Sequence, residues 1–419
     1  MTHFASDYRW PASSLAVTIQ ARRDVEVAEA LVMNDRLILR RTGGFPYNSA
    51  SPSVNVRTTL DGNPAILRGV ATSVTDFRVD EVWIGVADIP ELVTEVSTRF
   101  EHLSVACTPT RRGAARMAVG PITLPALDGA RSMSMFIEVD GESLTIAAKE
   151  PAPLDEFEVH LLTFQDLLTF LVDEPSGREV LRVKSLNGEV AQVHERVRFP
   201  RALPAESRAA RPFVSLIGAE AALGIERWWS ARKGLRPVTE MAAALCYAPS
   251  VLVESDLAVS AAALDRLLTK TMRLPRRFSR SDVKEVVDAI DGAVLDLPVK
   301  TAMLEGVKSA LNSTPLRTKI EELVRVLGPV VLGNAYIDGD KWVTAFMETR
   351  NAIAHGAGHD GFWTNQSLLR ATRRANRIML ILALLQHLGA SGRVLSLAAT
   401  DLGDKHAKWH RRGPIFDAP

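Results

Sequence analysis

Apolar and polar residues alternate along the first half of the chain with the two-residue period of half-buried strands. Leu15, Val17 and Ile19 alternate with polar or small residues, and so do Val25 and Val27. Successive side chains of a strand point to opposite faces of a sheet, so this period predicts strands with one buried face. We therefore expect the N-terminal half to be β-rich.

Two hairpins are predicted in this half. Asp140-Gly141 is a two-residue turn signal inside Met133–Ala148, because a type I′ turn requires positive φ at its central residues. The turn predicts these cross-strand pairs: Val139 with Glu142, Ile137 with Leu144, Met135 with Ile146, and Met133 with Ala148. All but the first are apolar, so the pattern agrees with the turn. Asn187-Gly188 predicts a second hairpin between Val180–Leu186 and Val190–Val197, and a short helix is expected around Phe164–Leu171.

The second half of the chain has helical periodicity instead. The predicted helices are Ala219–Lys233, Leu257–Met272, Ser281–Leu295, Leu316–Leu327, Lys341–Ala354 and Asn365–Leu388. Ser279 and Ser313 are hydroxyl caps at helix starts, the latter followed by a first-turn proline. Gly328-Pro329 and Gly356 are stop signals.

The stretch Arg201–Pro212 has the composition of a linker and marks the main domain boundary. The predicted organisation is a β-rich N-terminal region at 1–212, a helical connector at 213–250, an all-α helical-bundle domain at 251–400 and a basic C-terminal tail at 401–419. The predicted fold class is therefore α+β.

Composition limits the classes of function. The chain has 419 residues, enough for two or three domains, and a net charge of only +1, so any nucleic-acid contact requires a local basic patch. Cys107 and Cys246 lie far apart and indicate buried small residues in a reducing compartment. Met1–Trp10 lacks a signal-peptide pattern, and the longest apolar stretch, Ile378–Leu385, is too short to span a bilayer. We expect a cytoplasmic protein with no membrane contact.

The candidate chemistry lies in Trp342–His355. Arg350 and Asn351 lie off the apolar stripe of this predicted helix, and His355 follows its last turn. Their pattern resembles the Arg-polar-x(3 or so)-His motif of HEPN ribonucleases. Attack of a ribose 2′-OH on the adjacent phosphate needs a base of near-neutral pKa, which histidine supplies. A guanidinium can donate two hydrogen bonds to the negative transition state, so neither a metal nor another cofactor is required.

Spacing adds a constraint to this site. Arg350 and His355 are five residues apart and point about 140° away from each other on an ideal helix. They converge only if the helix ends at His355 or if two subunits pool their residues. Asn351 and His355 share a face, so Asn351 could fix the imidazole tautomer. The geometry favours a homodimer with a composite active site. The alternative is structural, because a last-turn histidine before glycine is an ordinary helix C-cap.

A basic face on the following helix favours RNA as the substrate. It consists of Arg370, Arg373, Arg374 and Arg377. The spacing i, i+3, i+4, i+7 gathers these arginines on one side, which suits phosphates, although a solvated surface has the same pattern. In the intervening glycine-rich loop, His359 and Trp363 could contact a base, Trp363 by stacking; otherwise they are exposed loop residues.

Other patterns carry less weight. Gly356–Gly361 matches G-x-G-x-x-G but follows a helix rather than a strand, so a dinucleotide site is not expected. His406 and His410 have the spacing of a metal pair without a third ligand. Trp228-Trp229 is interpreted as core or interface packing.

The layout of the chain resembles the ApeA-like HEPN proteins of bacterial anti-phage defence. A β-rich N-terminal region, a helical connection and a C-terminal HEPN domain follow one another, and Glu226–Glu240 looks like the junction of that family. Only Arg350, Asn351 and His355 are specific to its motif. The resemblance implies a metal-independent endoribonuclease that acts as a toxic effector in abortive infection and is homodimeric. It also implies that the N-terminal region either senses infection, for example through a phage-derived trigger, or restrains the nuclease.

Two other functions remain open. One is a non-catalytic HEPN scaffold that binds RNA or a partner protein through the arginine face. The other is an N-terminal domain that binds a ligand or phage protein, with the helical part serving only for dimerisation.

Overall fold

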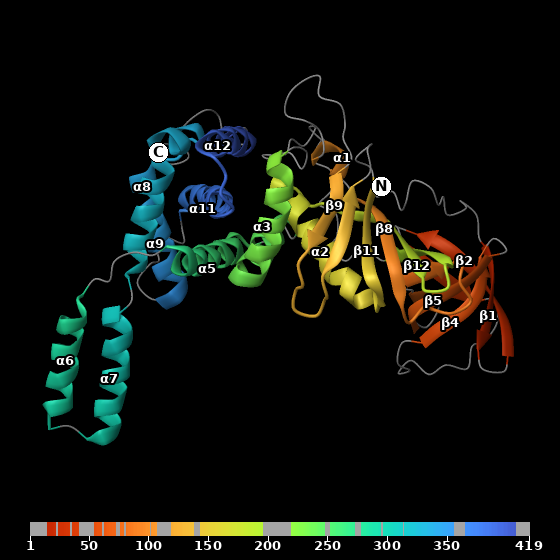
Figure 1. Ribbon diagram of the computed structural model, residues 1–419, viewed down its shortest axis with the longest axis horizontal. Coiled ribbons are helices and arrows are strands. Elements are labelled where there is room, and N and C mark those ends of the chain that lie inside the picture. Colours follow the sequence, from red (N-terminus) through yellow and green to blue (C-terminus); the bar gives the residue numbers. More distant parts are fainter. Residues whose placement is uncertain are drawn as a thin grey trace. The chain divides into compact units, whose positions relative to one another are not determined.

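The structure is a computed structural model, and Figure 1 shows its two compact units, residues 1–249 and 250–419. It describes residues 15–21, 24–33, 36–41, 54–60, 63–72, 76–78, 81–100, 102–106, 119–137, 143–195, 219–247, 252–272, 278–294, 296–312, 314–355 and 365–407. The predicted linker Arg201–Pro212 lies outside the described residues, and the helices of the expected connector belong to the first unit.

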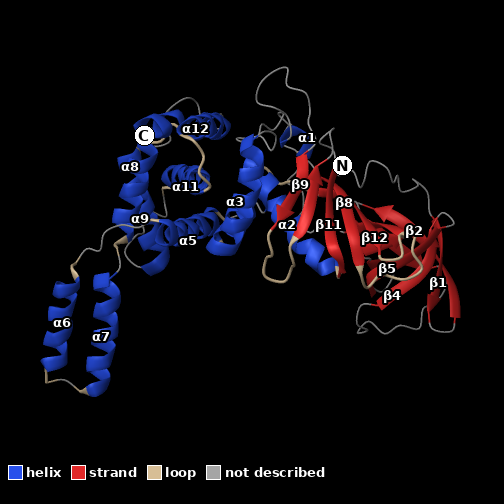
Figure 2. Cartoon of the chain, viewed as in Figure 1, coloured by secondary structure: helices blue, strands red, loops and turns tan. Residues whose placement is uncertain are grey.

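The first unit is built on an antiparallel sheet, drawn in red in Figure 2. Its strands are β1 Leu15–Ala21, β2 Asp24–Met33, β3 Arg36–Arg41, β4 Val54–Leu60, β5 Asn63–Thr72, β6 Asp76–Arg78, β7 Glu81–Ile84, β8 Val93–Phe100, β9 Val119–Leu124, β10 Met133–Ile137, β11 Ser143–Ala152, β12 Arg178–Ser185 and β13 Val190–Glu195. The order is β1-β2-β3-β6-β5-β7-β13-β12-β8-β11-β10-β9, with β4 paired to β5. The β-rich prediction for this half is confirmed.

The structure contains both predicted hairpins. In the first, Met135 pairs with Ile146 and Ile137 with Leu144, in the predicted register. All four side chains are buried, although the Asp140-Gly141 turn itself lies outside the described residues. The second hairpin joins β12 to β13, and Gly188 in its turn has φ +83°, a conformation that favours glycine.

Helix α2, Leu154–Val172, is covered on two sides, and α1, Leu103–Ala106, also packs on it. Phe164 of α2 contacts Phe100 of β8 at 5.5 Å between ring centroids, while Phe170 contacts Trp228 of α3 at 4.9 Å. Helices α3, Ala219–Leu235, and α4, Val238–Tyr247, form the layer beyond α2. The predicted helix at Phe164–Leu171 was therefore only the C-terminal part of α2.

The tandem tryptophans of α3 are part of the core, as predicted. Trp228 and Trp229 are both 0% exposed. The Trp228 indole donates to the carbonyl of Thr163 at 3.1 Å, and the Trp229 indole donates to Nδ1 of His160 at 3.0 Å. Nε2 of His160 lies 2.8 Å from the carbonyl of Arg131, so the neutral imidazole carries its proton on Nε2.

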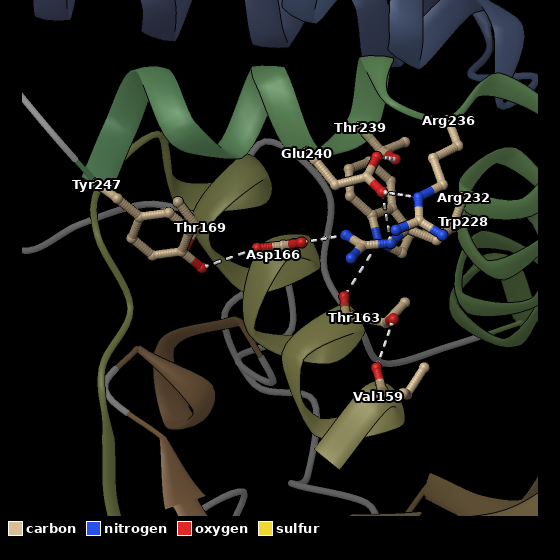
Figure 3. Close-up of polar contacts among 10 residues, drawn as sticks. All are labelled: Val159, Thr163, Asp166, Thr169, Trp228, Arg232, Arg236, Thr239, Glu240 and Tyr247. Atoms are coloured by element: carbon tan, nitrogen blue, oxygen red, sulfur yellow. Dashed lines mark hydrogen bonds and ion pairs between the residues drawn. The ribbon is translucent and has the colours of Figure 1, made fainter. Parts of the chain in front are cut away.

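A network of charged residues joins α2 to α3 and α4 (Figure 3). Asp166 of α2 forms an ion pair with Arg232 of α3 and accepts a hydrogen bond from the Tyr247 hydroxyl at 3.2 Å. Glu240 lies 3.4 Å from Arg232 and 3.2 Å from Arg236, so two carboxylates face two guanidinium groups. Burial raises the pKa of Asp166 to about 6, although Arg232 opposes the shift.

The second unit is helical, as predicted. Its helices are α5 Val253–Thr271, α6 Arg280–Gly292, α7 Leu297–Asn312, α8 Leu316–Asn334, α9 Gly339–His355, α11 Gln366–His387 and α12 Gly392–Ala407. Helix α11 is its centre, because α5, α8, α9 and α12 all pack against it and every residue from Ile378 to Leu385 is buried.

One predicted helix start is confirmed, one lies outside the described residues, and one predicted stop was only half right. Ser279 and Asp282 form the reciprocal capping box on α6. Ser313 is not described, and Pro315 precedes α8 without a side-chain cap. Asn365, which had not been singled out as a cap, accepts from the Leu368 backbone N–H at 3.0 Å at the start of α11. Gly328-Pro329 was predicted to end a helix. Gly328 does leave helical geometry, with φ +75°, but α8 resumes beyond it to Asn334. Proline tolerates the start of a helical segment, so the pair produces a kink rather than an end.

Helices α6 and α7 form a hairpin of their own. Lys300 binds the carbonyl of Asp291 at 2.6 Å across it. None of the described side chains of the two helices is buried. Val286, Leu297, Val299 and Met303 are among its exposed apolar residues.

His160 should make the stability of the first unit depend on pH. Burial lowers the pKa of His160, with the Arg131 carbonyl and Glu156 acting against that shift. As pH falls below about 6.5, the imidazole of His160 binds a proton in the unfolded chain but not in the folded protein. The free energy of unfolding therefore decreases as pH falls below about 6.5. This residue adds at most about 1.4 kcal/mol per pH unit to the slope of the unfolding free energy.

Urea unfolding at a series of pH values between 7.5 and 5.0 measures this slope. His160→Asn keeps an acceptor for Trp229 but cannot titrate, so its slope should be shallower than that of the wild-type protein. Equal slopes would contradict the assignment of His160 as the responsible group.

Candidate active site at the end of helix α9

The N-terminal part of α9 is anchored by a buried hydrogen-bond chain. The Trp342 indole donates to Oδ1 of Asn376 on α11 at 2.9 Å, and Nδ2 of Asn376 donates to the Ser260 hydroxyl on α5 at 3.3 Å. All three residues are at most 1% exposed. Trp342 also packs on Phe346, with 5.6 Å between ring centroids. One amide thus holds three helices together and sets the position of α9 on α11.

The candidate catalytic residues lie at the opposite end of α9. Arg350 and Asn351 are half-buried, and Nη1 of Arg350 lies 3.4 Å from Oδ1 of Asn351. This contact was not expected, because neighbouring residues of a helix usually point apart. His355 is the last residue of α9, and its side chain lies outside the described part of the chain. The predicted contact between Asn351 and the imidazole of His355 therefore stays a prediction.

The arginine face of α11 is divided by a carboxylate from α5. Arg373 forms an ion pair with Asp256, whose side chain is only 10% exposed. Burial raises the pKa of Asp256, while Arg373 and, more weakly, Arg377 act against that shift. Arg370 is exposed and Arg374 is half-buried. The spacing brought the four arginines to one helix face, but it did not show that a carboxylate lies beside two of them.

Most of the remaining candidate residues lie in segments that the structure does not describe. His359 and Trp363 lie outside the described residues, as does His410, so their predicted roles stay predictions. His406 lies in α12.

Across the described ranges, no three His, Cys, Asp or Glu side chains are grouped as a metal site would require. No helix among those ranges has both the length and the apolar composition needed to cross a membrane. Cys246 is a buried free thiol, as expected, whereas Cys107 is not described.

Comparison with known proteins identifies the domain. The second unit is a helical bundle built round the apolar helix α11. Residues 261–393 match the family described as Apea-like HEPN, so the second unit contains an Apea-like HEPN domain. This family is associated with ribonuclease activity, and HEPN domains often dimerise and bind RNA. No curated protein and no solved structure matches the chain.

Sequence reasoning missed the polar residues that position the site. Asn376 interrupts the apolar stripe of α11 between Leu369 and Met379, and an isolated amide there indicates a buried polar contact. Asp256 and Ser260 are four residues apart on α5 and so share the face that meets α11. The amide was detectable in the sequence, but its partners were not.

Replacing Asn376 with leucine should destabilise the helical unit. The change leaves the Trp342 indole N–H buried without its acceptor and removes the amide that donates to Ser260, which together should lower the unfolding free energy by about 1–3 kcal/mol. Urea unfolding monitored by tryptophan fluorescence measures the loss. Thr344→Ala on the exposed side of α9 is the control and should change stability by no more than about 0.5 kcal/mol. A loss no greater than in this control would show that the amide does not hold the three helices.

Proposed function

We propose that the protein is a metal-independent endoribonuclease whose active site is formed by Arg350, Asn351 and His355. The observation that carries the proposal is the placement of these residues within the Apea-like HEPN domain, at the end of a helix that is firmly anchored at its other end. The rigid N-terminal half of α9 fixes where its last turn lies. A site built on such a helix holds its groups in a defined geometry.

Each residue has a role that its chemistry supports. His355 acts as the base that removes the proton of the ribose 2′-OH. Arg350 stabilises the charge that develops on the phosphorus-bound oxygens. Asn351 orients its neighbours, and its 3.4 Å contact with Arg350 supports this role. The 2′-oxygen forms a bond to phosphorus while the bond from phosphorus to the 5′-oxygen of the next nucleotide breaks, and that oxygen takes up a proton. The products are an RNA end with a 2′,3′-cyclic phosphate and one with a 5′-hydroxyl.

A homodimer completes the proposed site. Arg350 and His355 are five residues apart on α9, about 140° round an ideal helix, so one copy of the helix does not bring both groups to one phosphate unless its last turn deviates. Pooling the residues of two copies removes this difficulty. Dimerisation is also frequent among HEPN domains.

The biological role that we propose is toxic effector in bacterial anti-phage defence. The support is the family of the C-terminal domain together with a separate sheet-based unit in the same chain. In this proposal the N-terminal region senses a phage-derived trigger or restrains the nuclease.

RNA cleavage by purified variants tests the proposal. His355→Ala and Arg350→Ala should each lower the rate of cleavage by about 10²–10⁴-fold, the range for loss of a general base or of a transition-state hydrogen bond. The wild-type protein should cleave equally well in excess EDTA and leave cyclic phosphate ends. Circular dichroism should show that both variants keep the fold.

His387→Ala at the exposed end of α11 and Arg317→Ala on α8 are matched controls that should leave the rate unchanged. Undiminished cleavage by both active-site variants would refute the proposed site. RNA binding without cleavage by the wild-type dimer, at any protein concentration, would instead favour a scaffold that binds RNA.

A further inference from the structure

The four arginines of α11 differ in what neutralises them. Arg373 is paired with Asp256, and the same carboxylate interacts electrostatically with Arg377. Arg370 and Arg374 have neither an ion pair nor a hydrogen bond with any side chain of the described ranges. The basic face therefore consists of two arginines that interact with Asp256 and two that have no anionic partner among the described side chains.

Arg374 is in an unfavourable electrostatic environment. Its side chain is half-buried, so it has lost part of its hydration. Burial lowers the pKa of Arg374, and the positive charges of Arg373 and Arg370 lower it further. Guanidinium groups remain charged in proteins, so this cost persists until an anion binds nearby. An incoming phosphate would relieve it by pairing with a group that is already partly desolvated.

Arg370 and Arg374 share one side of α11. They are four residues apart, which places them about 40° from each other round the helix axis. Asn376, which faces α9 and α5, lies about 140° from their midpoint, whereas Arg373 lies only about 60° from Asn376. The unpaired arginines thus point away from the side of α11 that holds α9, while Arg373 lies beside the helix interface.

We propose that Arg370 and Arg374 form a subsite for a backbone phosphate of single-stranded RNA, distinct from the phosphate that is cleaved. Arg373 is a positioning residue that ties α11 to α5 through Asp256. Arg370 and Arg374 are then binding residues that lower KM, and they do not touch the reacting atoms. That the bound polymer is RNA rests on the proposed function. The separation of Arg370 and Arg374 from the arginines beside Asp256 does not depend on it.

RNA binding by the full-length protein tests the division. A fluorescent oligoribonucleotide without strong base pairing is titrated against the His355→Ala protein, which keeps the RNA intact, at salt concentrations of about 50 to 300 mM, where counterion release dominates. The double substitution Arg370→Ala/Arg374→Ala should reduce the slope of log affinity against log salt by about 1.4, since each phosphate contact to single strands contributes about 0.7. Arg370→Ala alone, at an exposed position, should reduce it by about 0.7.

Arg373→Ala is the matched control on the same helix face. It should leave the slope unchanged but lower the midpoint of urea unfolding, because Asp256 loses its partner. An unchanged slope in the double variant, or an equal reduction by Arg373→Ala, would overturn the division. Binding is measured on a protein that does not cleave, so this result stands apart from whether the wild-type protein is a nuclease.

Steady-state cleavage by the otherwise wild-type protein separates binding from chemistry. The double variant should raise KM about tenfold or more and keep kcat within about twofold. A fall in kcat at constant KM would place these arginines at the reacting phosphate and overturn the proposed subsite.

Discussion

The architecture of the helical unit depends on a single buried amide. Asn376 accepts a hydrogen bond from Trp342 and donates one to Ser260, so both polar ends of its side chain are satisfied at the point where α5, α9 and α11 meet. Apolar packing alone would allow these helices to slide, because it has no fixed direction. The amide sets their register, and with it the place where α9 ends and where Asp256 meets Arg373.

The two units differ in how charges between their helices are balanced. In the first, Asp166 and Glu240 face Arg232 and Arg236, so the charges balance where α2, α3 and α4 meet. In the second, the carboxylate of Asp256 lies beside Arg373 and Arg377, and Arg374 is half-buried close to the positive charges of Arg373 and Arg370. A balanced cluster holds helices together, whereas an unbalanced one favours an incoming anion. Local rules of stability tend to be broken where a protein binds a ligand, and this tendency underlies the binding site that we propose on α11.

The sequence predicted features that local physics controls. Around Asp140-Gly141 the turn signal and the alternation of apolar residues predicted the same strand pairing, and β10 and β11 pair in that register. Helices α4, α7 and α12 were not among the predicted helices, and α12 extends to Ala407, into the predicted basic tail. In α7 the apolar residues are not gathered on a buried stripe. Helix α2 was shortened because a helix covered on two sides lacks a clear polar face. For the site, spacing located Arg350, Asn351 and His355 on one helix, and the domain containing them matches the expected family. The ion pair of Arg373 joins residues more than a hundred positions apart, which no local pattern reveals.

The hairpin of α6 and α7 differs from the rest of the helical unit in how its stability arises. Its described side chains are all at least partly accessible to water, so its opening exposes little new apolar surface. Its backbone amides therefore depend on hydrogen bonds within each helix and on contacts between the two helices, such as that between Lys300 and Asp291. Such a segment opens as a separate cooperative unit while α11 stays closed. In native-state hydrogen exchange the domain would then show two populations of amides, with the hairpin exchanging first.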